Sequence, residues 1–446
     1  TYGFDDVRKK LALFIIPIFI SGFSALEKKE VHFLLKAFVI GVLFSCFWSF
    51  CVYFGALDEV IVDKREYSRF TSHVRFGLEI AIAVFIAGYF YSKSLTITHK
   101  ALWIVILLLL LFTLYHFSFI TGTVVVLVTA AILILVFGLR SDKKKIRIPL
   151  ILGLCSILLF GTYFVHSSYQ DFYANDGVTP IKELDRTPHG GIYERTERTA
   201  NSKIKENGYF LEKNISWKEL EAAWNERSDL NFQGNDLKGN ILRHTLIRYI
   251  TSKGQRKDRQ AIESLSQNEI EAIEKGTPNY KYLEMNDFRI RLHKIIWEFD
   301  AYQNGRNVNG HSILMRWEYL KVTGHIIKNN FWTGVGTGDV QDSYKSFYRE
   351  NDSVLEEHYR RRGHNQYLTY FVTLGIAGFL WFLFVLLYPL ITQKAYLNYL
   401  YISFFSILAL SMFTEDTLEN QVGIYLFVFF NSLLLLSNFK SEKIAQ

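Results

Sequence analysis

A basic stretch that ends directly at an apolar run is the most chemically suggestive part of the sequence. Residues 360–379 read RRRGHNQYLTYFVTLGIAGF, so three arginines, a histidine and an asparagine stand where a hydrophobic helix is expected to begin. Guanidinium groups bind phosphate oxygens in two-point contacts, and imidazole is the most frequent general base in enzymes. His364 and Arg362 therefore predict a site for an anionic substrate. The alternative is an ordinary basic collar whose side chains extend to lipid headgroups.

A second arginine lies upstream within an amphipathic helical pattern. Arg316 is part of SILMRWEYLK (residues 312–321) and stands next to Trp317. Tyr319 and Leu320 follow three and four residues later, which places them beside Arg316 on a helix. A guanidinium among aromatic and aliphatic side chains is partly removed from water, so we expect it to have an anionic partner.

A third group of cations lies at the outer end of a predicted membrane span. The stretch YSRFTSHVRFGLEI (residues 67–80) carries Arg69, His73 and Arg75. Ionisable groups inside or at the edge of a span are candidates for function. An alternative for Arg75 is an exposed i,i+4 pair with Glu79, worth about 0.5 kcal/mol.

Together these residues predict an outward-facing cavity with several guanidinium groups and one imidazole. Such a cavity suits a lipid-linked phosphate or pyrophosphate, with a base to take a proton from a hydroxyl. Glu415, in the acidic stretch TEDTLEN (residues 414–420), is a candidate for holding a guanidinium or contacting an acceptor. The spacing of His, Cys, Asp and Glu fits no metal site, and we expect neither a cofactor nor nucleic acid as a partner.

The glycine-rich stretch GVGTGD (residues 334–339) is not expected to bind a nucleotide. It lacks the P-loop lysine and follows a predicted helix rather than a strand. Because glycine permits tight turns, we expect this stretch to shape a turn that returns the chain to the membrane.

The elements that must position these residues are mostly membrane helices. Hydrophobic residues make up 50% of the 446-residue chain and fall in blocks. A helix needs about 20 apolar residues to cross a bilayer. The sequence therefore predicts an all-α polytopic membrane protein, with membrane lipids as partners. Candidate spans lie at 11–25, 32–55, 73–91, 101–117, 119–138, 147–165, 367–390, 396–413 and 421–438, of which 73–91 is the least lipid-like.

Lysine and arginine in short loops indicate the orientation. The loop SDKKKIR (residues 141–147) is predicted to be cytoplasmic, which places residues 166–366 and 414–420 outside. Arg8, Lys9 and Lys10 would then also lie outside, against the rule. The chain begins at Thr1, and an upstream portion, or a first segment that does not span, would explain the disagreement.

The region between the sixth and seventh predicted spans is charged and patterned. Three domains are therefore predicted: membrane helices over 1–165, a mainly helical extracytoplasmic loop domain over 166–366, and membrane helices over 367–446. Ser216 is a candidate N-cap for the first helix of the loop domain. Helical spacing of apolar residues marks 217–228, 242–253, 258–275, 287–302, 312–328 and 342–349.

Several of these stretches resemble one known family. GHNQYLTYFVTLGIAGF, NGHSILMRWEYLKV and NNFWTGVGTGD are similar to motifs of the O-antigen ligase and polymerase superfamily of bacterial envelope enzymes. SWKELEAAWNERS, LIRYITSKG and TEDTLEN look like its Bacteroidetes-type branch. The resemblance implies a metal-independent, inverting glycosyltransferase with a GT-C-type helix bundle. Its donor would be a glycan on undecaprenyl pyrophosphate, used at the periplasmic face of the bacterial inner membrane.

The resemblance also implies roles for single residues. His364 takes the place of the base and Arg316 that of the arginine that binds the donor pyrophosphate, with Asn365 holding the histidine in position. Many members carry Ser-Arg-Gly at the start of a mid-bundle helix, whereas FITGT (residues 119–123) lacks the arginine. Arg69 or Arg75 is our candidate replacement. The further candidates for substrate contact are Arg69, Arg75, Arg362, His311 and Glu415.

The leading hypothesis is an O-antigen ligase whose acceptor is a hydroxyl of the lipid A core. An O-antigen polymerase, with the growing glycan as acceptor, and a protein O-oligosaccharyltransferase are alternatives that the donor-side residues do not separate. A transporter of lipid-linked glycans would also need a cationic cavity, although the sequence shows no repeated half. A non-catalytic envelope scaffold would tolerate loss of His364.

Overall fold

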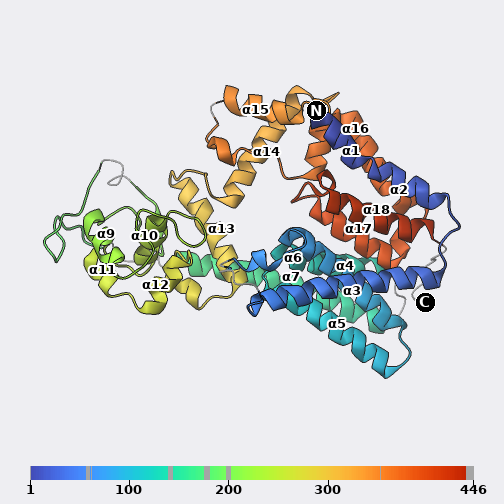
Figure 1. The fold of residues 1–446 in the computed structure, drawn as a ribbon, viewed down its shortest axis with the longest axis horizontal. Coiled ribbons are helices and arrows are strands. Elements are labelled where there is room, and N and C mark those ends of the chain that lie inside the picture. The colour runs from blue at the N-terminus through green and yellow to red at the C-terminus, as the bar shows by residue number, and fades with distance from the viewer. Residues whose placement is uncertain are drawn as a thin grey trace. The chain divides into compact units, whose positions relative to one another are not determined.

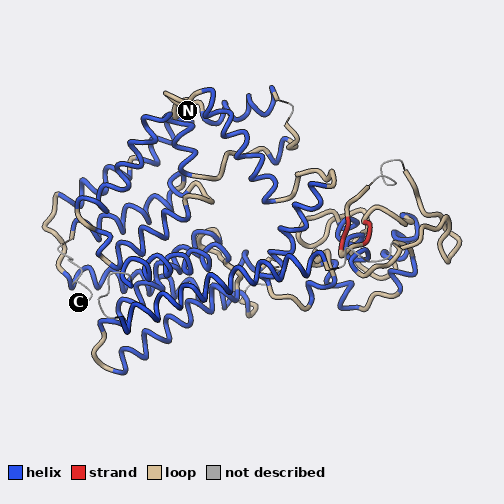
Figure 2. The backbone as a smooth tube through the Cα atoms, turned by 180° about the vertical axis from the view of Figure 1, so that it is seen from behind, coloured by secondary structure: helices blue, strands red, loops and turns tan. Residues whose placement is uncertain are grey.

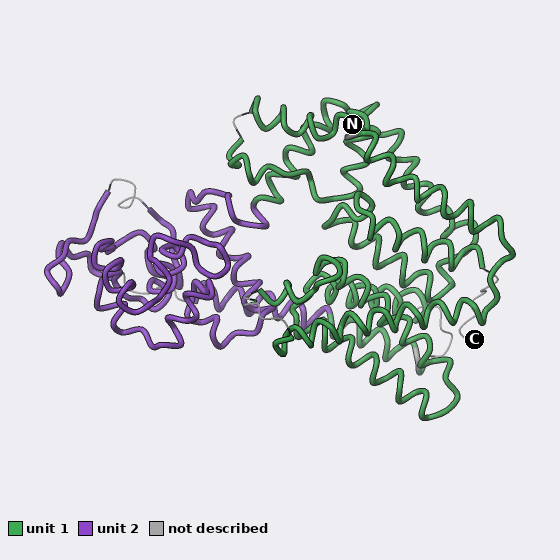
Figure 3. The backbone as a smooth tube through the Cα atoms, viewed as in Figure 1, with its two compact units in different colours: residues 1–157, 315–446 green, residues 158–314 purple. Residues whose placement is uncertain are grey.

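The computed structural model describes residues 2–56, 61, 63–138, 144–174, 181–196, 202–351 and 353–437. They form two compact units, of which unit 1 comprises residues 1–157 and 315–446 and unit 2 comprises residues 158–314 (Figure 3). The predicted domains 1–165, 166–366 and 367–446 have different boundaries and stay a prediction, because a division by compactness does not locate a membrane.

Unit 1 is built from helices that the apolar blocks of the sequence form (Figure 1). Residues 158–173 of α7 and the first turn of α14 belong to unit 2. The elements are α1 (Tyr2–Lys10), α2 (Ala12–Ser21), α3 (Lys28–Tyr53), η1 (Lys64–Tyr67), α4 (His73–Lys93), α5 (Ile97–His116), α6 (Ile120–Leu133), η2 (Ile134–Gly138), α7 (Lys144–Tyr173), α14 (Ser312–Asn329), α15 (Val340–Glu350), η4 (Glu357–Tyr359), α16 (Gln366–Thr392), η5 (Ala395–Leu397), α17 (Tyr399–Ser411), η6 (Thr417–Glu419) and α18 (Gln421–Leu436).

Six of the described helices are long and apolar enough to cross a membrane, which confirms the predicted all-α, multi-pass membrane protein. They are α3, α4, α5, α6 with η2, α7 from Arg147, and α16, while α17 and α18 are shorter apolar helices. The predicted span at 11–25 contains α2, a helix of 10 residues. At about 15 Å it is shorter than the roughly 30 Å hydrocarbon core.

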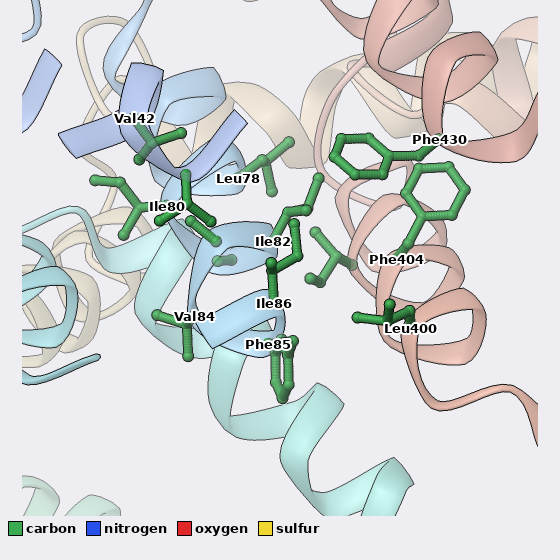
Figure 4. Close-up of a cluster of buried hydrophobic side chains, with 14 of the residues drawn as sticks. Val42, Leu78, Ile80, Ile82, Val84, Phe85, Ile86, Leu400, Phe404 and Phe430 are labelled. Carbon is green, nitrogen blue, oxygen red and sulfur yellow. The ribbon is translucent and has the colours of Figure 1, made fainter. Parts of the chain in front are cut away.

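Helix α4 is the centre of the membrane helices of unit 1. Of its most apolar window 72% is buried, against 33% or less for the other candidate spans, so the expectation that 73–91 is the least lipid-like span is confirmed. Leu78, Ile82 and Phe85 pack with Phe404 of α17 in one hydrophobic cluster (Figure 4). Because α4 contacts α3, α5, α6 and α17, its first turn is fixed by the whole bundle.

Helix α16 is not a straight span, because it bends sharply at Gly375. This residue has φ 65 and ψ −171, a backbone conformation that favours glycine. The ring centroids of Tyr370 and Phe382 lie 4.4 Å apart and those of Phe371 and Phe379 lie 5.1 Å apart. Residues twelve apart on a straight helix are about 18 Å apart. The nine residues before Gly375 therefore fold back along the residues that follow it.

The loop after α14 fills this bend with its own backbone. The Val335 and Gly336 amides donate to the Val372 and Thr373 carbonyls at 2.9 Å, and the Ile376 amide donates to the Phe331 carbonyl at 2.8 Å. The prediction that GVGTGD shapes a turn is thereby confirmed at Gly334, which has φ 68. Its return of the chain to the membrane stays a prediction.

We expect Gly375→Ala to lower the free energy of unfolding by roughly 2–3 kcal/mol. A Cβ at Gly375 would overlap the Trp332 carbonyl oxygen, and alanine disfavours a positive φ. Gly324→Ala in α14 is the control, since a Cβ there meets nothing within 4 Å and alanine suits a helix better than glycine. Thermal unfolding of both variants in detergent micelles measures the effect. Equal melting temperatures would contradict a backbone constraint at Gly375.

Unit 2 is mainly helical and has its own core around Trp224 and Trp297. Its described strands form one short antiparallel pair (Figure 2). Ser216 stands at the N-cap of the first helix but makes no capping hydrogen bond. The predicted helix 258–275 is two helices, because Ser266 caps a new one with Glu269. The elements are β1 (Lys205–Glu206), β2 (Tyr209–Phe210), α9 (Trp217–Asn225), α10 (Leu242–Ser252), α11 (Arg259–Glu263), α12 (Gln267–Glu274), η3 (Tyr280–Leu283) and α13 (Asp287–Gln303).

Candidate functional site

His364 has an unusual backbone conformation just before α16. Its φ of 47 lies in the left-handed region, which costs a residue with a Cβ about 1 kcal/mol or more. The preceding Gly363 packs so closely that an added Cβ would lie 2.7 Å from Oγ1 of Thr323. Such strain persists only where surrounding contacts enforce it, and it is typical of functional sites.

Asn365 is the residue that fixes the start of α16. Its side-chain oxygen accepts a hydrogen bond from the Leu368 amide at 3.1 Å and so caps the helix. Its side-chain nitrogen donates to the Phe413 carbonyl at 3.1 Å. Asn365 therefore ties the His364 backbone both to α16 and to the loop between α17 and α18.

The imidazole of His364 is half-buried and its nitrogens make no hydrogen bond within the described residues. Its ring lies 5.7 Å from the ring of Tyr319, which α14 positions. The Tyr319 hydroxyl donates a hydrogen bond to the Tyr359 carbonyl at 2.6 Å. The Tyr319 ring is therefore held at its hydroxyl as well as at its backbone in α14. The structure thus leaves both imidazole nitrogens available to a substrate.

Arg316 reaches the same loop from α14. One guanidinium nitrogen donates to the Thr414 carbonyl at 2.8 Å and another to Oε1 of Glu415 at 3.1 Å. The Arg316 side chain is 43% exposed, so a ligand can reach it. The contact that the sequence suggested for Glu415 is present, and Arg316 would exchange this carboxylate for a substrate anion.

The loop 412–420 is held against the first turns of α16 by contacts that we did not predict. The Gln366 amide donates to the Met412 carbonyl at 2.9 Å, and the Gln366 side-chain oxygen accepts from the Leu418 amide at 2.6 Å. The Thr369 hydroxyl donates to Asp416 at 2.7 Å. These bonds fix the loop against the start of α16.

A buried ion cluster includes Glu419 of this loop, and no sequence pattern predicted it. The Lys10 ammonium lies 2.8 Å from a carboxylate oxygen of Asp6 and 2.8 Å from one of Glu419. Burial lowers the pKa of Lys10, but the charge of Glu419, the Tyr370 hydroxyl and the hydrogen bonds to Asp6 and Glu419 together outweigh burial and raise this pKa above its usual range. Lys10 therefore remains charged. Its pairing with Asp6 and Glu419 accounts for a lysine at this point of the chain, without a basic surface loop.

Arg362 connects the ion cluster to the His364 segment. Its Nε donates to Gln341 of α15 at 3.0 Å, and one terminal nitrogen lies 3.9 Å from Glu419. The Gln366 side chain also donates to Glu419 at 3.2 Å. Glu419 is thus the common partner of Lys10, Arg362 and Gln366, and no pattern in the sequence singled it out.

The cations around the start of α4 make no hydrogen bond or ion pair with His364 among the described residues. Arg75 donates to the Ser72 hydroxyl at 3.0 Å, and no ion pair joins it to Glu79 in the described structure. Arg69 is exposed on the turn before α4, where its charge acts on Tyr67. His73 interacts electrostatically with Glu415, so the start of α4 lies within reach of the acidic loop. The replacement of the absent family arginine by Arg69 or Arg75 stays a prediction.

His311 lies in unit 2, where its surroundings keep it neutral. Its Nε2 accepts from Nε of Arg306 at 3.3 Å, and its ring lies 5.7 Å from that of Trp297. Burial, and then the charges of Arg306 and Arg248, lower the pKa of His311 to about 4. At neutral pH His311 therefore brings no positive charge to a substrate, and its predicted substrate contact stays untested.

We expect acid to loosen unit 2 between about pH 6.5 and pH 4. Burial also lowers the pKa of His293 to about 4. The unfolded chain binds protons at His293 and His311 below pH 6.5 and the folded chain does not, so stability falls by up to about 3 kcal/mol per histidine.

Protection factors of the α10 and α13 amides in the intact protein at pH 7 and pH 5, taken relative to the unfolded-chain exchange rate at each pH, measure this loss. His293→Phe should reduce the acid-induced loss of protection, and His189→Phe, at an exposed position, should leave it unchanged. Equal protection factors at the two pH values would contradict the buried neutral histidines.

Family comparison finds a known domain in part of the chain. Residues 277–383 match a family model described as O-Antigen ligase, so the chain carries an O-antigen ligase domain. The matched stretch contains Arg316, Arg362, His364 and Asn365, while Glu415 and Glu419 lie outside it. No curated protein matches the chain. The domain associates the protein with glycan transfer at a membrane, and among the described residues no group of three His, Cys, Asp or Glu could hold a metal ion.

Proposed function

We propose that the protein is an O-antigen ligase that transfers a glycan from undecaprenyl pyrophosphate to a hydroxyl of lipid A-core. The reaction takes place at the periplasmic face of the bacterial inner membrane, on a GT-C-type helix bundle. The observation that carries this proposal is the His364 imidazole. Its backbone is strained, its nitrogens make no hydrogen bond within the described residues, and Arg316 bonds to the neighbouring loop 412–420.

The proposed reaction uses one residue as a base and two arginines that bind the pyrophosphate. A nitrogen of His364 takes the proton of the acceptor hydroxyl as its oxygen attacks the anomeric carbon of the donor sugar. The bond between this carbon and the pyrophosphate oxygen breaks with inversion, and undecaprenyl pyrophosphate leaves with the bonding electron pair. Arg316 and Arg362 stabilise the negative charge that develops on the pyrophosphate.

The exchange of partners at Arg316 couples donor binding to the acidic loop. In the structure Arg316 is neutralised by Glu415, so the pyrophosphate displaces a carboxylate. The freed Glu415 then lies near the incoming acceptor, where it accepts hydrogen bonds from sugar hydroxyls. This arrangement favours transfer over transport, because a carrier has no use for an imidazole base beside its anion site.

The decisive experiment is transfer in vitro with the purified full chain and a lipid-linked glycan. We expect glycan to appear on lipid A-core, with release of undecaprenyl pyrophosphate, in the presence of a metal chelator. Product on the growing glycan instead would assign a polymerase, and product on a protein hydroxyl would assign an O-oligosaccharyltransferase. Movement of intact donor across proteoliposomes without transfer would overturn the proposal.

A further inference from the structure

The bend of α16 and the loop seated in it form one element that the site does not use directly. Residues 331–336 lie between α14 and α15, and their backbone bonds to α16 on both sides of Gly375. An added Cβ at Gly334 would lie 2.5 Å from the Thr373 carbonyl and from the Gly375 amide nitrogen. The two backbones are therefore in direct contact, with no side chain between them.

This contact supplies the hydrogen bonds that the bend removes from the helix. An unbroken helix would pair the Ile376 amide with the Val372 carbonyl, whereas here these two groups bond to Phe331 and Val335. Non-helical backbone at membrane depth is tolerated only where such groups are paired within the protein. The loop supplies these partners to the Ile376 amide and the Val372 carbonyl. A bend exposed to water would not need them, because water could bond to both groups.

The side chains around the loop are apolar and face outward. Trp332 is 76% exposed, and Phe331 and Leu374 are each 40% exposed. Residues 331–338 (FWTGVGTG) contain no charged residue, although Lys328 and Asp339 flank them closely. Transfer of a side chain with this exposed apolar area from water to an apolar environment is favourable.

The apolar surface continues onto the second half of α16, a helix apolar enough to enter a membrane. Phe331 contacts Phe371, which stacks on Phe379, so a row of rings links the loop to that half. Leu380 and Trp381 beyond this row are 56% and 66% exposed. A surface that is covered by lipid along α16 is therefore continuous with Trp332.

We propose that residues 331–336 are a re-entrant segment that inserts into the bilayer together with the bend of α16, with lipid acyl chains around Trp332. In this arrangement the two halves of α16 that meet at Gly375 enter the lipid together with the segment. The inference stands on this packing and does not depend on the proposed reaction.

Spin labels at single cysteines test the insertion in liposomes. In the full chain with Cys46, Cys51 and Cys155 replaced by alanine, labels are placed by Trp332→Cys and, in case that variant does not fold, by Thr333→Cys. Leu380→Cys on α16 is the lipid-facing control. Ile192→Cys, at an exposed position of unit 2, is the aqueous control.

We expect the label at 332 or 333 to collide with oxygen at least about three times more often, relative to a water-soluble nickel chelate, than the label at 192. A ratio like that of Leu380→Cys supports insertion. A ratio like that of Ile192→Cys, or low access to both relaxers, would overturn it, because the segment would then face water or another protein.

Discussion

His364→Gly is expected to lower the turnover number by about 10²- to 10⁴-fold, the usual contribution of a general base. Glycine removes the imidazole and at the same time suits the φ of 47 that His364 adopts. The protein should therefore be at least as stable as the wild type while it loses activity. This separation is the reason to prefer glycine to alanine, which would keep the backbone strain.

Initial rates of transfer with saturating donor measure the loss, and melting temperature measures the fold. Added imidazole should restore part of the rate in His364→Gly, because the small base can occupy the vacated space. His325→Gln is the matched control, since His325 is exposed on α14 and bonds only to the Lys321 carbonyl among the described residues. Wild-type turnover in His364→Gly would show that the imidazole takes no part in the reaction.

Arg316→Ala is expected to lower kcat/KM for the lipid-linked donor by about 10²- to 10³-fold, as loss of one charge-stabilising donor does. Arg316→Lys should recover only part of it, because an ammonium cannot make the two-point contact of a guanidinium. The loss of stability should stay below about 1 kcal/mol, since the pair with Glu415 is partly exposed.

Steady-state rates over a range of donor concentrations separate binding from the chemical step. Arg349→Ala is the charge-matched control, because Arg349 is exposed on α15. Glu415→Gln should lower the KM for the donor, since Arg316 no longer has to leave a carboxylate. Unchanged donor kinetics in Arg316→Ala would show that the anion binds elsewhere, with Arg362 the next candidate.

The sequence located most helices but misjudged the length of one and missed the bend in another. Apolar runs predicted a span at 11–25, although Gly22 ends α2 after 10 residues. The run 367–390 was predicted as one span, yet Gly375 divides it. Hydrophobicity reports whether residues can be buried, and it does not distinguish a straight helix from two halves packed against each other.

For the candidate site, too, local patterns predicted some of the residues and did not predict others. Residue types and spacing made candidates of His364, at the start of an apolar helix, and of Arg316, among aromatic and aliphatic side chains, and their roles in the site stay a prediction. Their shared neighbours were missed. Lys10 and Glu419 form an ion pair across almost the whole chain, and no local pattern records such a contact.

By itself the sequence determined that this is an α-helical membrane protein with a basic, imidazole-containing segment, because periodicity and charge are properties of neighbouring residues. The tertiary structure decided which groups meet. It brought Arg316 to Glu415 across 99 residues, and it folded α16 back on itself around a loop from another segment. Such contacts depend on how separate elements pack, and packing follows from their combined shapes rather than from any one stretch.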